Sequence, residues 1–364
     1  MRISDTRRGS TVTRRIAVIA GDGIGPEVTA EALRVLEVLR RERGVDVELW
    51  ELPLGAELFL KNGTTFPLEL RDEVLKTCSA VLLGAVGDPR VPSGEHAHDI
   101  LLGMRTAWDL YANVRPVRAL TDELVPLRGK SKSDVNFVIY RENTEGQYVG
   151  AGSERGRGAA DEIAMSREVH TRRGVERLLR AALDYARQHQ RPLVMTDKSN
   201  AIQSQGIWRR VLAELAAEYA DVKTEQLYVD ALAARLIQAP ERHGVIAGNN
   251  LFGDILADLC AALAGGLGLA PSANLHPAVP GHIGLFEPVH GSAPDIAGRG
   301  VANPLGAIRS LGMLLAHLGY PTEAERIERT STEVLRLGRV TADVGGPLGT
   351  AAAGSAFLEV LAHH

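Results

Sequence analysis

The sequence contains little cysteine, no long apolar stretch and no excess of basic charge. Its 364 residues include two cysteines, Cys78 and Cys260, whose separation fits neither a disulfide framework nor a zinc ribbon, so we expect a reducing compartment. Residues 1–14 are polar, and no apolar stretch is long enough to span a bilayer. We therefore predict a cytoplasmic protein without a signal peptide, a membrane helix or a membrane partner.

The charge balance argues against a second class of function. The 41 lysines and arginines stand against 45 aspartates and glutamates, which gives a net charge of −4, and no long basic run occurs. Non-specific binding to nucleic acid requires a basic surface, so we expect no nucleic-acid partner. A small anionic ligand could still be held by a few well-placed arginines.

What the sequence does contain is an alternation of strand-like and helix-like stretches. Hydrophobic residues make up 45% of a chain that is long enough for one large domain or two ordinary ones. The alternation predicts an α/β fold. We expect strands at 15–20, 45–52, 80–86, 135–140, 192–196 and 225–229, helices at 174–188 and 206–219, and a polar loop or protruding arm at 150–162.

Three arginines lie where a strand or helix would present them to a ligand. Arg105 follows a helix-like pattern, Arg115 is expected to end one strand, and Arg141 is expected to end another. The planar guanidinium group makes paired hydrogen bonds with carboxylates, so the three together would suit a dicarboxylate or tricarboxylate. Spacing alone leaves the alternative that each is an ordinary solvated arginine.

Two further groups of residues are candidates for a metal site and for a general base. Asp254 and Asp258 are four residues apart in a predicted helix, so they share one face, and their oxygens suit Mg²⁺ or Mn²⁺. Lys198 directly follows a predicted strand, where a lysine can act as a base if its environment lowers its pKa. A solvated helix face and a surface lysine are the alternatives.

These segments together resemble the isocitrate/isopropylmalate dehydrogenase family of β-decarboxylating dehydrogenases, and the resemblance covers nearly the whole chain. The matching motifs, in chain order, are GDGIGPEV (21–28), MRTAWDLYANVRP (104–116), YRENTEGQYVG (140–150), TDKSN (196–200), YVDA (228–231), NNLFGDILAD (249–258), GGLGLAPSAN (265–274) and EPVHGSAPDIAGRGVANP (287–304).

The resemblance implies a role for each candidate residue. Arg105, Arg115 and Arg141 resemble the arginines that hold the malate carboxylates of a hydroxy-dicarboxylate or tricarboxylate substrate. Asp254 and Asp258 resemble metal ligands for Mg²⁺ or Mn²⁺. The catalytic set is expected to be Tyr148, which protonates the enol carbon, Lys198, which helps to remove the C2 hydroxyl proton, and Asp230, a third metal ligand. Asp230 and Lys198 would come from the neighbouring subunit of a homodimer with shared active sites, and a tetramer is the alternative assembly.

For the cofactor, the resemblance implies NAD. Asn200 would lie near the nicotinamide, and an adenosine loop would be formed by the residues Glu287, His290, Gly291, Ala293, Asp295, Ile296 and Asn303. An acidic Asp295 suits the free ribose hydroxyls of NAD and repels the phosphate of NADP. The GDGIG segment lacks the spacing of a dinucleotide fingerprint, so it is read either as a structural turn or as a direct contact.

The helix before Arg105 is where the family distinguishes its substrates. Leu101 and Leu102 resemble the leucine pair that packs against an isopropyl group, which favours 3-isopropylmalate. Asp99 occupies the position of a serine in isocitrate-specific members, where it would repel a γ-carboxylate. Other motifs resemble homoisocitrate and tartrate dehydrogenases, so homoisocitrate, isocitrate, tartrate, an unusual 3-substituted malate of a biosynthetic pathway, and a non-catalytic ligand-binding relative remain alternatives.

The resemblance also implies a two-domain architecture with a mostly parallel sheet flanked by helices. A discontinuous cofactor-binding domain is expected from residues 1–110 and 265–364. A central domain for substrate, metal and dimerisation is expected from residues 111–264, with a dimer arm at 150–166. A cleft between the two domains would hold the substrate.

Overall fold

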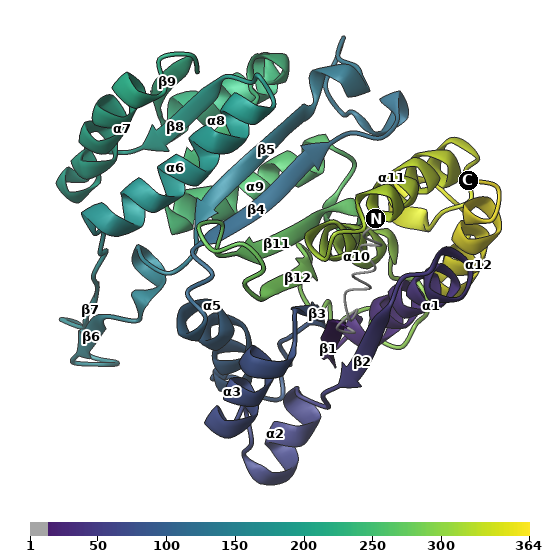
Figure 1. Cartoon of the computed structure of the whole chain (residues 1–364). Coiled ribbons are helices and arrows are strands. Elements are labelled where there is room, and N and C mark those ends of the chain that lie inside the picture. The colour runs from purple at the N-terminus through teal and green to yellow at the C-terminus, as the bar shows by residue number, and fades with distance from the viewer. Residues whose placement is uncertain (1–13) are drawn as a thin grey trace, which may run out of the picture.

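A computed structural model describes residues 14–364, so the polar start of the chain lies outside the described residues. One ten-stranded sheet runs through the molecule in the order β2-β1-β3-β12-β11-β4-β5-β10-β8-β9 (Figure 1). Its strands are β1 (Arg14–Gly21), β2 (Val47–Glu51), β3 (Ala80–Ala85), β4 (Ala112–Arg118), β5 (Asn136–Glu142), β8 (Leu193–Asp197), β9 (Thr224–Tyr228), β10 (Val245–Gly248), β11 (Pro271–Leu275) and β12 (Gly284–Pro288). Pairing is parallel except where β11 joins β12 and β4 and where β4 joins β5, so the predicted mostly parallel α/β fold is confirmed.

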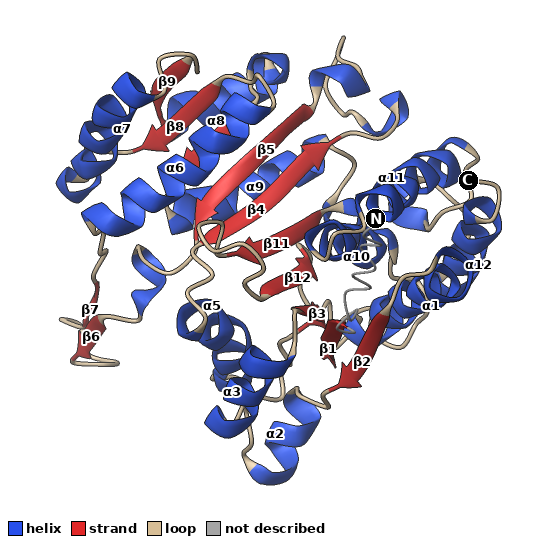
Figure 2. Ribbon diagram, in the orientation of Figure 1, coloured by secondary structure: helices blue, strands red, loops and turns tan. Residues whose placement is uncertain are grey.

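Helices cover both faces of the sheet, as Figure 2 shows. The helices of the half that contains both chain ends are α1 (Gly25–Arg43), α2 (Ala56–Asn62), α3 (Leu68–Thr77), α5 (Gly103–Ala107), α10 (Leu305–His317), α11 (Pro321–Arg336) and α12 (Thr350–Leu361). The other half carries α6 (Arg172–Gln188), α7 (Gly206–Glu218), α8 (Val229–Gln238) and α9 (Asn250–Leu263). Among residues 14–364, no helix combines the length and apolar character that crossing a bilayer requires.

Four buried clusters show how the sequence forms these layers. In one half, α1 and α10 pack on one face of the sheet, and α3 and the segment around Met104 pack on the other. In the other half, α6 and α7 cover one face, and α8 and α9 cover the opposite one. Helix α6 illustrates the local cause: Val175, Leu178 and Leu179 follow helical spacing and are fully buried, while arginines occupy its outer face. The sheet thus carries a core on each face at both ends.

Of the two alternatives predicted for residues 150–162, a polar loop and a protruding arm, the structure shows an arm. Strands β6 (Gly152–Arg155) and β7 (Ile163–Ser166) pair as an antiparallel hairpin that projects from the molecule (Figure 1). Every residue of both strands is exposed. Because neither face of this ribbon packs on a core of its own chain, its sequence shows no alternation of apolar and polar residues that could reveal a strand.

Candidate active site

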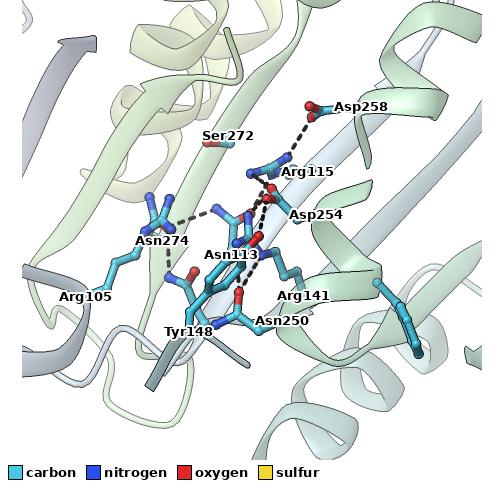
Figure 3. Close-up of polar contacts among 12 residues, drawn as sticks. Arg105, Asn113, Arg115, Arg141, Tyr148, Asn250, Asp254, Asp258, Ser272 and Asn274 are labelled. Carbon is cyan, nitrogen blue, oxygen red and sulfur yellow. Dashed lines mark hydrogen bonds and ion pairs between the residues drawn. The ribbon is translucent and has the colours of Figure 1, made fainter. Parts of the chain in front are cut away.

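The three predicted arginines converge at one end of a cleft between the halves of the sheet. Arg105 lies on α5, Arg115 on β4 and Arg141 on β5, and all three are buried. Arg115 lies in the middle of β4 and does not end it, which corrects the predicted strand boundary. Side chains along a strand point to the two faces of the sheet in turn, and that of Arg115 points to the face covered by α9 (Figure 3).

Each arginine is held by a specific hydrogen-bonding partner. Arg105 Nη2 donates to Glu287 Oε1 at 2.8 Å, and Arg115 Nη2 donates to Asp254 Oδ1 at 3.0 Å. Arg141 donates through Nε and Nη2 to Asn250 Oδ1 at 3.0 and 2.7 Å. Burial, together with the charges of Arg115 and Arg105, lowers the pKa of Arg141 to about 9. So many buried positive charges in one place favour an anionic ligand.

The two predicted metal ligands face the same cleft from α9. Asn249 caps this helix, because its side chain accepts a hydrogen bond from Phe252 N at 2.8 Å. Arg115 Nη1 donates to Asp258 Oδ1 at 3.3 Å, and Arg141 forms an ion pair with Asp254. Burial raises the pKa of Asp258, and the neighbouring Asp254 raises it further. A cation placed between the two carboxylates would relieve this repulsion.

Tyr148 reaches the carboxylates from the turn that precedes the hairpin. Its hydroxyl donates to Asp254 Oδ2 at 3.2 Å, and the guanidinium carbon of Arg141 lies 5.5 Å from the centre of its ring. Burial raises the pKa of Tyr148, and the negative charge of Asp254 adds to this effect. The hydroxyl therefore stays protonated at neutral pH and is able to donate a proton.

The cleft between these groups has a volume of about 410 Å³. Its charged and polar lining is formed by Arg105, Arg115, Arg141, Tyr148, Asp254, Asp258 and Glu287, and part of its wall is formed by Leu101, Leu102 and His98. This wall belongs to a π-helical turn at His98–Leu102 that leads into α5. Sequence analysis did not single out His98, whose only signal was its place three residues before Leu101.

A buried amide network behind the arginines was also missed. Asn113 Nδ2 and Asn143 Nδ2 both donate to Asn274 Oδ1, at 3.0 and 2.9 Å. Asn274 Nδ2 donates in turn to Glu287 Oε1 at 2.9 Å, and Asn113 Oδ1 accepts from Arg115 Nε at 2.6 Å. The network therefore connects the Arg105 and Arg115 sites across three strands. Hydrogen bonds from buried amides restrict the rotamers of their charged neighbours, although Asn143 Oδ1 and Arg105 Nε have no partner in the described structure.

Three other predicted residues lie together but outside this cleft. Lys198 Nζ donates to Asp230 Oδ1 at 2.7 Å, and this hydrogen bond lowers the pKa of Asp230. Asn200 lies in the same exposed turn as Lys198. In the part of the chain that the structure describes, no group of three or more potential ligands is placed to hold a metal. Within one chain, Asp230 is therefore not brought to Asp254 and Asp258.

The structure places Asp99 beside the cleft wall with hydrogen-bonding partners of its own. Its carboxylate accepts from Arg71 Nη2 at 2.7 Å and from Phe66 N at 3.2 Å, and it also bonds to Thr65. It is not among the residues that line the cleft. Asp99 joins the π-helical turn to α3 through its ion pair with Arg71, and its role in substrate choice stays a prediction.

The predicted cofactor loop borders the same cleft. His290 and Gly291 line it, and burial lowers the pKa of His290. Ala293 has a positive φ of 39°, while Asp295 is exposed and Ile296 packs against the core beside α10. The last predicted residue of the loop, Asn303, donates through Nδ2 to Asp343 Oδ2 at 3.0 Å.

The GDGIG turn supports this loop from beneath. Ile24 N donates to Ser292 O at 2.8 Å. A Cβ atom on Gly23 would lie 1.9 Å from Ser292 O, and the φ of Gly23 is +58°. Only glycine fits this position, because a side chain would collide with the backbone of the loop. This contact supports the interpretation of the segment as a structural turn.

Comparisons with known proteins agree with this arrangement. The family model described as isocitrate/isopropylmalate dehydrogenase matches residues 15–360. A 3-isopropylmalate dehydrogenase of Thermobifida fusca is 43% identical over 332 residues, which cover 90% of this chain and 92% of that protein. A 3-isopropylmalate dehydrogenase of Corynebacterium glutamicum strain R is 43% identical over 357 residues, 95% of this chain and 99% of that protein.

Among solved structures, an isocitrate dehydrogenase from Methylococcus capsulatus superposes with a TM-score of 0.86 at 37% identity and covers 96% of this chain and 99% of its own. A β-decarboxylating dehydrogenase from Thermococcus kodakarensis superposes with a TM-score of 0.77 at 35% identity, and 96% of each chain is covered. The chain belongs to the isocitrate/isopropylmalate dehydrogenase family.

Proposed function

We propose that this enzyme oxidises and decarboxylates 3-isopropylmalate to 4-methyl-2-oxopentanoate, CO₂ and NADH, with NAD⁺ and either Mg²⁺ or Mn²⁺. One observation carries the proposal: a single cleft joins three buried arginines and two aspartates at one end to a pair of leucines on its wall. The polar end suits the two carboxylates of a malate. The leucine wall suits an apolar substituent on C3, and the similarity to the two curated 3-isopropylmalate dehydrogenases agrees with this preference.

The residues present fit a divalent cation. Asp254 and Asp258 are hard oxygen donors on one helix face, and the raised pKa of Asp258 reflects its burial and the nearby negative charge of Asp254. They would hold the ion together with Asp230 of a second subunit, since Asp230 does not reach them within one chain. When bound, the cation supplies positive charge that stabilises oxygen anions developing during oxidation and decarboxylation.

Side chains of the protein orient the substrate and transfer the two protons. Arg105, Arg115 and Arg141 orient the two malate carboxylates, which fixes the C3 carboxylate for its loss as CO₂. Lys198 of the second subunit accepts the C2 hydroxyl proton as hydride leaves C2. Tyr148, which its raised pKa keeps protonated, donates a proton to C3 after decarboxylation.

The wall and the cofactor loop determine selectivity. Burying an isopropyl group against Leu101 and Leu102 would contribute about 2 kcal/mol. The exposed carboxylate of Asp295 faces solvent on the loop, where it suits the ribose hydroxyls of NAD and would repel the phosphate of NADP. Glu287, His290, Gly291, Ala293, Ile296 and Asn303 would form the rest of the dinucleotide site, with Asn200 near the nicotinamide.

We also propose the division into two domains that the family resemblance implies. We place residues 1–110 and 265–364 in a cofactor-binding domain and residues 111–264 in a central domain. Asp109, with a φ of 50°, and Gly265, with a φ of 111°, lie beside the two boundaries. The exposed hairpin carries Ile163 and Met165 at its surface, which suits a dimer arm, and a dimer would supply Lys198 and Asp230 to each site.

A substrate panel tests the proposal directly. The purified enzyme is assayed by NADH absorbance with Mn²⁺ and, in turn, 3-isopropylmalate, homoisocitrate, isocitrate, tartrate and malate. We expect the highest kcat/KM with 3-isopropylmalate, and turnover of none of the five would refute the assignment. Lys198→Ala should lower kcat by at least about 100-fold. The matched control is Lys223→Ala, an exposed lysine that the proposed mechanism does not use, and it should leave kcat unchanged.

A further inference from the structure

A second cleft lies between the same two halves of the molecule, and the proposed reaction does not use it. We call it the rear cleft. It has a volume of about 520 Å³, within the range of small-molecule sites, and exceeds the 410 Å³ of the candidate active site. One wall is formed by β4, β5 and the end of α6, and the other by α10 and α11.

The rear cleft and the active-site cleft lie on opposite faces of the sheet. Neighbouring residues of one strand point to opposite faces. On β4, Arg115 lines the active-site cleft and Pro116 lines the rear cleft; on β11, Ser272 lines the active-site cleft and Pro271 lines the rear cleft. The two clefts therefore share the β4/β11 junction, and a ligand in the rear cleft cannot contact the active-site side chains directly.

The charge of the rear cleft selects an anion. Four arginines and two glutamates line it, so its formal charge is +2, whereas the whole chain carries −4. Arg309 is already engaged, because its Nε donates to Glu328 Oε1 at 2.8 Å and its Nη2 donates to Glu328 Oε2 at 3.1 Å. Arg118 and Arg329 form no ion pair within residues 14–364. They stand on opposite walls, one at the end of β4 and the other on α11.

The remaining lining of the rear cleft favours a ligand with an apolar part. The walls also present the apolar side chains of Pro116, Val138, Pro271, Met313 and Ala316. A mostly apolar pocket with a few charged groups is typical of sites that bury most of a small ligand. A strongly hydrated inorganic anion would leave this surface unused.

We infer that the rear cleft binds a small organic anion with an apolar body, whose charged group lies between Arg118 and Arg329. Such a ligand ties α11 to β4 across the junction. The inference does not depend on which hydroxy acid the enzyme oxidises.

The test uses 8-anilinonaphthalene-1-sulfonate, a fluorescent probe that joins a sulfonate to an apolar aromatic body. The full-length enzyme is titrated with the probe, and binding is followed by fluorescence. Ala316→Phe fills the cleft from an exposed position of α10, and Arg118→Glu reverses the charge at the end of β4. Each should weaken probe binding by at least about ten-fold. Ala213→Phe places the same side chain at an exposed site of α7 outside the cleft and should leave binding unchanged.

Displacement identifies the ligand class. Octanoate should displace the probe, and 1-octanol, which has the same chain without the charge, should do so at least about ten-fold more weakly. Unchanged binding in both variants, with melting temperatures equal to that of the wild type, would overturn the site. Equal displacement by the alcohol would overturn the anion. Probe binding that falls as protein concentration rises would show that a second copy covers the cleft, which would also refute the inference.

Discussion

His243 should make this enzyme sensitive to mild acid. Its ring is buried behind β10 and packs edge-on against Phe137, with ring centres 6.2 Å apart. Neither ring nitrogen has a hydrogen-bond partner in the structure. Burial lowers the pKa of His243 to about 4, and the positive charge of Arg235 adds to this effect, while Glu225 and Glu241 oppose it. The folded protein therefore holds this histidine neutral.

The sign and size of the effect follow from proton linkage. An unfolded histidine titrates near 6.5, so below that pH the unfolded state binds a proton that the folded state does not. Stability is therefore lost as pH falls from about 6.5 to about 4. The difference of about 2.5 pKa units corresponds to at most about 3 kcal/mol.

Chemical denaturation at pH 7 and pH 4 measures this loss. Protein concentration is held constant, because the stability of an oligomer depends on it. In His243→Leu the difference in unfolding free energy between the two pH values should shrink by up to about 3 kcal/mol relative to the wild type. His363→Gln, at an exposed histidine, is the matched control and should leave that difference unchanged. An identical loss in His243→Leu and the wild type would refute the reasoning.

Four further substitutions test the proposed site. Leu102→Ala should raise KM for 3-isopropylmalate about ten-fold and leave KM for malate unchanged in the NADH assay, because malate has no C3 substituent to bury. Arg141→Lys should lower kcat/KM by about 100-fold, since lysine cannot make the paired hydrogen bonds to Asn250, and a lysine enzyme of full activity would contradict the arginine assignment. Asp258→Asn should weaken Mn²⁺ binding, measured by electron paramagnetic resonance, by more than about ten-fold, and EDTA should abolish wild-type turnover until Mn²⁺ is restored. Asp295→Lys should move the preference from NAD⁺ towards NADP⁺, measured as the ratio of the two kcat/KM values.

Long buried segments could be predicted from the sequence alone. The strand at Leu193–Asp197 and the helix at Arg172–Gln188 differ from the expected bounds by one or two residues, because continuous apolar runs and a helical apolar face signal burial directly. The position of Arg115 could not be predicted, since β4 continues through Pro116 to Arg118. A proline is tolerated at such a position when its missing N–H leaves no essential bond of the ladder unmade.

Site residues that belong to a sequence motif could be predicted. Residues that only tertiary packing brings into the site could not. The motif resemblance supplied the arginines and the aspartates of α9, and the structure brings these into one cleft. It could not show that Asp99 turns towards Arg71, because that contact joins residues 28 positions apart on different helices. It also could not find Asn113 and Asn274, whose side chains meet only when β4 and β11 pair.

The contacts of Asp254 give a physical reason why the proposed cation and the substrate anion would depend on each other. Arg115 and Arg141 both bind Asp254 Oδ1, so the carboxylate that would serve the metal is occupied by the groups that would serve the substrate. A malate carboxylate that engages these arginines takes over their hydrogen bonds and releases Asp254. A released and partly buried carboxylate beside Asp258 is unfavourable until a cation neutralises the pair. In the proposed mechanism each ligand would thus remove a charge that opposes the other, so we expect the substrate anion and the cation to bind with positive coupling.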